Sequence, residues 1–132
     1  MISGVLDTHA FVWYLNGDQR LSTSAQIFIS SALQQGQLLS VPAISIVEII
    51  YLEEKNKIPQ GFITWLLGSL QSLPFVIVPL DINIIQVIRQ IPRTLVPEMP
   101  DRVIVATALA LGVPLVTKDD TIRQCGLVQV IW

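Results

Sequence analysis

The chain has 132 residues, about the size of one domain, and 52% of them are hydrophobic while only 14% are charged. This composition excludes a disordered or low-complexity protein. Eight Lys and Arg against ten Asp and Glu give a formal charge of -2, which excludes a generally basic protein that coats nucleic acid but permits a locally basic groove. The single cysteine, Cys125, excludes an internal disulfide framework and a zinc site built from cysteines.

The mean hydropathy is high, at +0.61, and two uncharged windows, Leu21–Val47 and Ile58–Leu80, are long enough to cross a bilayer. Polar residues in the first window and Pro and Gly in the second divide both into shorter elements, so we expect no membrane span. The first ten residues include Asp7 and His9 and no basic start to an apolar run, which predicts no secretory signal. A cytoplasmic protein is therefore expected, and its apolar surplus predicts a buried interface with a second copy or with a partner chain.

Apolar runs alternate with segments of helical spacing along the whole chain. In chain order the predicted elements are strand Met1–Leu6, helix Thr8–Leu15, helix Ser22–Leu33, strand Leu38–Val41, helix Ala43–Asn56, helix Phe62–Leu73, strand Phe75–Val78, helix Asp81–Ile91, helix Asp101–Leu111, strand Pro114–Thr117, helix Thr121–Cys125 and strand Val128–Trp132. Gly36 and Gly112 end two of the helices, and Pro74 ends a third. Short strands separated by helices predict one α/β domain over residues 1–132, a three-layer α/β/α sandwich around a parallel sheet.

Four carboxylates stand where such a sheet would bring them together. Asp7 and Asp119 follow predicted strands, and the carboxyl ends of parallel strands form the crevice in which these sheets bind ligands. Asp101 opens a predicted helix, and Glu48 interrupts a helix that is apolar almost all round, so it needs a partner. Taken singly, each Asp can be a capping or helix-dipole residue, and Glu48 can pair with Arg102. Taken together, without a matching set of bases, the four acids favour a shared cation.

An all-carboxylate pocket suits Mg²⁺ or Mn²⁺ rather than zinc, and His9 is expected to pack or hydrogen-bond locally rather than bind metal. Such a pocket supports phosphoryl chemistry, because one or two ions activate water and neutralise the leaving oxyanion. Apart from the four acids, six acids remain against eight bases, which suits a polyanionic substrate. The candidate phosphate contacts are Arg102, Lys118 and Arg123, although each is equally well explained as a surface charge or a counter-ion.

Four short stretches resemble successive motifs of the PIN-domain nucleases, most closely the VapC-type toxins of prokaryotic toxin–antitoxin systems. These stretches are Val5–Ala10 (VLDTHA), Ser45–Ile49 (SIVEI), Pro100–Ala108 (PDRVIVATA) and Leu115–Asp119 (LVTKD). The resemblance spans the chain in order, and the four motifs together are specific where any one alone would be weak.

The resemblance implies a parallel sheet of about five strands, a Mg²⁺ or Mn²⁺ site, and endoribonuclease activity on structured RNA such as tRNA, rRNA or mRNA. The implied acidic quartet is Asp7, Glu48, Asp101 and Asp119. It also implies that Glu98 is an auxiliary acid that holds metal through water, and that Thr117 orients a carboxylate. Relatives more often carry Asp at the position of Glu98, which weakens the expectation of a second metal ion.

The resemblance further implies a homodimer and an antitoxin partner, and the apolar helical segments Phe11–Leu15 and Ala43–Leu52 are expected to form a groove for an antitoxin helix. The leading hypothesis is thus a metal-dependent endoribonuclease. The alternative is a PIN-like module that binds metal or RNA without cutting. A phospho-accepting receiver is excluded because the strand Phe75–Val78 ends at Pro79 rather than at an acceptor Asp. A phosphatase of the haloacid type is excluded because His9 stands where a second Asp is needed.

Overall fold

The computed structural model describes all 132 residues. Its elements are β1 (Ile2–Leu6), α1 (Thr8–Asn16), α2 (Thr23–Gln34), β2 (Leu38–Pro42), α3 (Ala43–Glu54), α4 (Phe62–Ser69), the 3-10 turn η1 (Leu70–Ser72), β3 (Phe75–Val78), α5 (Ile82–Ile88), α6 (Met99–Leu111), β4 (Leu115–Val116), α7 (Asp120–Cys125) and β5 (Val130–Ile131). Every predicted helix and strand is present in the predicted order. None of the helices combines the length and the apolar character needed to cross a membrane.

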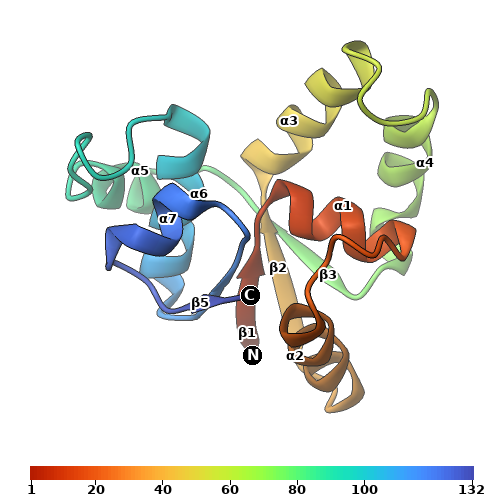
Figure 1. Cartoon of the computed structure of the whole chain (residues 1–132), viewed down its shortest axis with the longest axis horizontal. Helices are drawn as coiled ribbons and strands as arrows, with labels where there is room; N and C mark the ends of the chain where they lie inside the picture. The colour runs from red at the N-terminus through yellow and green to blue at the C-terminus, as the bar shows by residue number, and fades with distance from the viewer.

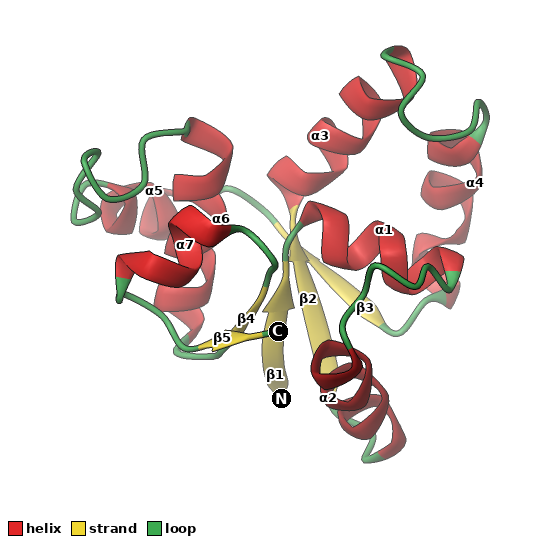
Figure 2. Ribbon diagram, in the orientation of Figure 1, coloured by secondary structure: helices red, strands yellow, loops and turns green.

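The five strands form one parallel sheet in the order β3-β2-β1-β4-β5 (Figure 2). Val5 in the central strand β1 pairs with Ser40 of β2 on one side and with Leu115 of β4 on the other. The strands β2 and β3 therefore lie on one side of β1, and β4 and β5, which come later in the chain, lie on the other. The carboxyl ends of β1 and β4 flank this reversal of strand order, which is where open α/β sheets bind ligands.

Helices cover both faces of the sheet, as the prediction of a three-layer sandwich requires (Figure 1). Consecutive strand residues point to opposite faces. Accordingly, Leu6 packs in one core with Phe11 of α1 and Ile29 of α2, whereas Val5 packs in a second core with Ile104 of α6. The helix α3 contacts both sides, since it touches α1 and α4 on one and α6 on the other.

The helix boundaries differ from the predictions beside the loop between α5 and α6. Helix α6 starts at Met99, two residues earlier than predicted, because proline is tolerated in the first turn and Pro100 lies there. Helix α5 ends at Ile88 rather than Ile91. The carbonyl oxygens of Ile88 and Ile91 both accept hydrogen bonds from Nη2 of Arg102, at 3.0 and 2.9 Å, so a side chain from α6 satisfies the end of this helix.

The other differences are small. The predicted helix Phe62–Leu73 is divided into α4 and η1, and the strands β4 and β5 are each two residues long. Helix α2 lies so close to β1 that a Cβ on Gly4 would come within 2.9 Å of Cε2 of Phe28. Only glycine allows this approach without a shift of the aromatic ring.

Candidate active site

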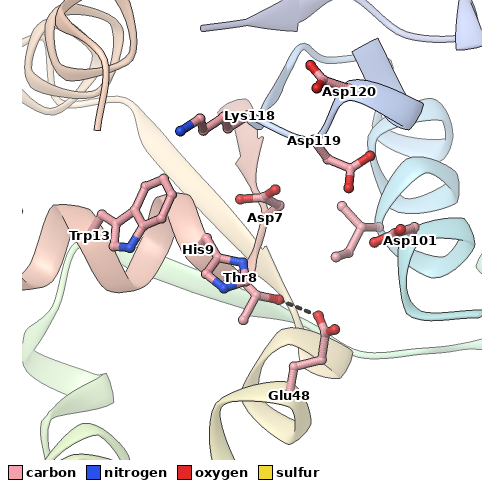
Figure 3. A pocket seen from close by; sticks show the side chains of 10 residues that line it. Asp7, Thr8, His9, Trp13, Glu48, Asp101, Lys118, Asp119 and Asp120 are labelled. Carbon is pink, nitrogen blue, oxygen red and sulfur yellow. Dashed lines mark hydrogen bonds between the residues drawn. The ribbon is translucent and has the colours of Figure 1, made fainter. Parts of the chain in front are cut away.

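The structure brings the four predicted acids together in a single hollow of about 400 Å³ at the carboxyl end of the sheet (Figure 3). We call it the acidic hollow. It is lined by Asp7, Thr8, His9, Trp13, Glu48, Asp101, Ile104, Lys118, Asp119 and Asp120. The acids come from four separate elements, because Asp7 follows β1, Glu48 lies on α3, Asp101 lies in the first turn of α6, and Asp119 precedes α7.

Asp7 and Asp119 each cap a helix while they face the hollow. Oδ1 of Asp7 accepts from the backbone N–H of Ala10 at 2.9 Å, and Oδ1 of Asp119 accepts from that of Ile122 at 2.9 Å. The capping interpretation of these residues is therefore correct, and it does not compete with a functional one. In each case the cap uses one carboxylate oxygen and fixes the direction of the other.

Thr117 connects the two carboxylates at the centre of the hollow. Its hydroxyl donates to Oδ2 of Asp7 at 2.5 Å and accepts from the backbone N–H of Asp119 at 3.0 Å. Thr117 is fully buried, so these hydrogen bonds are shielded from water. A buried hydroxyl that joins the ends of β1 and β4 holds Asp7 in one orientation.

Glu48 has no ionic partner. Its Oε1 accepts from the hydroxyl of Thr8 at 2.5 Å (Figure 3), and no base lies within ion-pair distance of it. Arg102, the alternative partner considered from the sequence, instead donates to the carbonyls of Ile88 and Ile91. The negative charge of Glu48 is thus left uncompensated in the hollow.

Two acids of the hollow have raised pKa values, and burial is the largest cause for both. Burial raises the pKa of Asp7 to about 6, despite hydrogen bonds from Thr117 and Ala10 that lower it. Asp101 accepts no hydrogen bond from the protein and forms no ion pair. Burial is the first cause that raises its pKa to about 6, followed by the negative charges of Asp119, Glu48, Asp7 and Glu98.

The donor set matches a hard divalent cation. All of the acids present oxygen, and the lack of counter-ions leaves a charge that such a cation would neutralise. No three of the His, Cys, Asp and Glu side chains are gathered closely enough to form a ready-made set of ligands. An ion that binds here would therefore have to bring the carboxylates closer together than they lie without it.

The remaining predicted site residues divide into those at the hollow and those away from it. Lys118 lines the acidic hollow, whereas Arg102 and Arg123 do not. Arg123 lies on the exposed side of α7, with Nη1 3.4 Å from Oδ1 of Asp120. Glu98 is the N-cap residue of α6 and is outside the wall of the hollow, although its charge acts on Asp101.

Several residues in the wall of the hollow lie outside the predicted set of site residues. Thr8, directly after Asp7, supplies the hydroxyl that holds Glu48. His9 and Trp13 also line the wall, and the only signal for this pair is their spacing of four residues on a predicted helix, which places them on one face. Their rings are 5.5 Å apart.

Comparison with known proteins agrees with this geometry. Residues 4–126 match the PIN domain family. The chain is 31% identical over 126 residues to ribonuclease VapC22 of Mycobacterium tuberculosis (strain ATCC 25618 / H37Rv), and the match covers 94% of this chain and 92% of that protein.

Solved structures show the same fold at lower identity. The chain is similar to VapBC2 from Rickettsia felis bound to a promoter DNA fragment, with a TM-score of 0.73 and 16% identity over 98% of this chain and 97% of that one. It is also similar to DNA-bound VapBC from Salmonella typhimurium, with a TM-score of 0.70 and 17% identity over 98% of this chain and 97% of that one. The chain therefore belongs to the PIN-domain family, as a VapC-type member.

Proposed function

We propose that the protein is a divalent-metal-dependent endoribonuclease and the toxin of a type II toxin–antitoxin pair. The observation that carries the proposal is the set of four uncompensated carboxylates at the point where the strand order reverses. Membership of the family, and the identity to a protein named as a ribonuclease, support cleavage of RNA over other phosphoryl chemistry.

The metal would be Mg²⁺ or Mn²⁺, held by Asp7, Glu48, Asp101 and Asp119, with Glu98 as an outer acid. Such an ion would supply a more acidic water as the nucleophile and neutralise the charge on the leaving oxygen, which gives 5′-phosphate and 3′-hydroxyl ends. No side-chain nucleophile is needed.

The protein's own groups position the reactants. The hydroxyl of Thr117 keeps Oδ2 of Asp7 in place and, by donating to it, favours the ionised carboxylate. The ammonium group of Lys118 is the only Lys or Arg charge in the wall of the acidic hollow. It lies where it can attract a phosphodiester toward a site that would otherwise repel it.

The experiment is a cleavage assay on a mixture of tRNA and rRNA, with Mg²⁺ or with EDTA, using protein freed of any antitoxin. Asp101→Asn is compared with the wild type, and Asp81→Asn is the matched control, because Asp81 caps α5 outside the hollow and asparagine also caps. We expect cleavage that requires the metal, is lost in Asp101→Asn and survives in Asp81→Asn. Cleavage in EDTA, or by Asp101→Asn at the wild-type rate, would contradict the proposal. RNA binding without cleavage by the wild type would favour the non-catalytic alternative.

We place the antitoxin contact in a second hollow of about 330 Å³, beside the first. This apolar hollow is lined by Thr8, His9, Ile44, Val47, Glu48, Tyr51, Leu52, Lys55, Met99 and Pro100. Val47, Tyr51 and Met99 are 44%, 57% and 61% exposed, which is unfavourable without a partner. Because Thr8 and Glu48 line both hollows, a peptide seated here would extend into the acidic hollow and block it.

The groove predicted between Phe11–Leu15 and Ala43–Leu52 needs a correction. Phe11 and Val12 are 0% and 3% exposed and pack in the core, and Trp13 is only 8% exposed, so this part of α1 offers little apolar surface to a partner. The apolar surface available to a partner therefore lies between α3 and the start of α6. Homodimer formation remains a proposal, and exposed Ile82 and Ile85 on α5 are its candidate surface. Light scattering should show a dimer that Ile82→Glu converts to a monomer.

A further inference from the structure

A third hollow adjoins the acidic hollow along helix α1. It has a volume of about 510 Å³ and lies between α1 and the C-terminal end of α3. His9 and Trp13 line both hollows, so the two are parts of one depression. Arg20 and Lys57 also line the third hollow, and we call it the basic hollow.

The sign of the charge changes across His9 and Trp13. The wall of the acidic hollow carries five carboxylates and one lysine, Lys118. The basic hollow carries Arg20 and Lys57 against the single carboxylate of Asp18. The five carboxylates would repel the charges of a polyanion next to its reacting group. The basic hollow offers these neighbouring charges a favourable place.

Arg20 is held in position before any ligand arrives. Its Nε donates to Oδ1 of Asp18 at 3.1 Å, its Nη2 donates to Oδ2 at 2.7 Å, and its Cζ lies 5.0 Å from the centre of the Trp13 ring. A guanidinium has five N–H donors, so three remain for another acceptor, in the planar arrangement that suits a phosphate. Lys118 also approaches Trp13, with Nζ 5.9 Å from the ring centre.

His9 supplies a surface for a base. Its side chain is exposed, and its ring lies 5.5 Å from that of Trp13 at an interplanar angle of 50°. Exposed aromatic rings beside a basic groove bind the bases of single-stranded nucleic acid by stacking, without need of a particular sequence. The junction of the two hollows thus combines cations with an aromatic ring.

We propose that the basic hollow is a subsite for the RNA strand adjacent to the scissile bond, with phosphates against Arg20 and Lys57 and one base stacked on His9. This inference rests on the proposed function, since it requires that RNA is the substrate of the acidic hollow. It adds a contact surface that adjoins the acidic hollow at His9 and Trp13.

The test is the binding of a labelled oligouridylate, long enough to span both hollows, measured in EDTA over a range of salt concentrations. The first variant is the double substitution Arg20→Gln and Lys57→Gln. Its matched control is the double substitution Arg89→Gln and Arg93→Gln, which removes the same charge from positions outside these hollows. Loss of two phosphate contacts to a single strand lowers the slope of log affinity against log salt by about 1.4. Lys57→Gln alone should lower the slope by about half as much. This single variant keeps the test valid if Arg20→Gln disturbs the loop that holds it. The control should keep the wild-type slope.

His9→Ala gives an independent arm. We expect it to lower the affinity about fivefold or more at every salt concentration while the slope stays unchanged, because stacking releases no counter-ions. Unchanged slopes in both basic-hollow variants would overturn the subsite. A polyglutamate of equal charge that competes as well as the RNA would also overturn it, in favour of an acidic peptide. Failure of the proposed function would be seen separately from failure of the subsite. In that case the wild-type protein would not cut RNA with Mg²⁺, whatever the salt slopes measured in EDTA.

Discussion

The burial of Asp101 and the repulsion from its neighbouring carboxylates predict that Asp101→Asn stabilises the metal-free protein. Asp101 accepts no hydrogen bond and forms no ion pair, and it faces three other carboxylates of the same hollow. Asparagine has nearly the same shape and no charge. The substitution therefore removes the cost of burying a charge, and the repulsion, without breaking a contact of the native structure.

The size of the effect follows from the pKa of Asp101, which is raised from 3.8 to about 6. A raised carboxyl pKa means that the folded state is favoured at low pH, and that this advantage is lost as the pH rises from about 4 through about 6. At pH 7 the ionised group costs about 3 kcal/mol relative to the unfolded chain. Contact with solvent and the amide's own cost of burial reduce the expected gain to about 1–2 kcal/mol, or roughly 3–8 °C in melting temperature.

The assay is thermal unfolding in EDTA at pH 7 and pH 4, with Asp81→Asn as the control for loss of a carboxylate elsewhere. The Asp101→Asn substitution should raise the melting temperature at pH 7, and the gap should close toward pH 4, where the carboxyl of the folded wild type is protonated and uncharged. Added Mg²⁺ should stabilise the wild type and not the variant, because a ligand stabilises only the state that binds it. An Asp101→Asn protein that melts at or below the wild-type temperature in EDTA at pH 7, or a gap that persists at pH 4, would refute the reasoning.

Three further predictions concern the neighbours of the carboxylates. Thr117→Val removes the hydroxyl between Asp7 and Asp119, so we expect a loss of about 2 kcal/mol in urea unfolding and weaker metal binding, both restored by Thr117→Ser. Arg102→Met should also cost about 2 kcal/mol, because the carbonyl of Ile91 loses its donor and that of Ile88 keeps only the backbone N–H of Ile91. The salt dependence of RNA binding should not change, and a changed slope would return Arg102 to the RNA surface. The rate of cleavage at subsaturating Mg²⁺ should fall below about pH 6, where Asp7 and Asp101 take up protons that compete with the ion, and initial rates between about pH 5 and pH 8 would measure it.

The fold could be predicted because its signals are local. The apolar run that ends at Leu6 and the helical spacing that follows it identify β1 and α1 without reference to the rest of the chain. The end of α5 could not be predicted in this way. It depends on the guanidinium of Arg102, which comes from another helix, and a loop of ten residues lies between the two helices.

The site was predictable to the extent that strand ends determine it. Asp7 and Asp119 lie together because β1 and β4 are neighbours in the parallel sheet. The bases were less predictable, because proximity in sequence does not give the direction of a side chain. Successive residues on a helix are about 100° apart, so Arg102 points away from the hollow that its neighbour Asp101 faces. Arg20 was missed because it reaches Trp13 only through the turn after α1.

The acidic hollow also shows why its carboxylates can remain without counter-ions. The N-termini of α1, α6 and α7 all lie at the hollow, since Asp7 and Asp119 cap two of these helices and Asp101 lies in the first turn of the third. Each N-terminus carries a partial positive charge that stabilises a nearby anion. Partial charges of this kind offset part of the repulsion among these acids, whereas a lysine or arginine salt bridge would occupy the carboxylate oxygens that a cation needs. Stability and ligand binding are therefore opposed at this site, and the protein should gain most of its local stability only when a cation is bound.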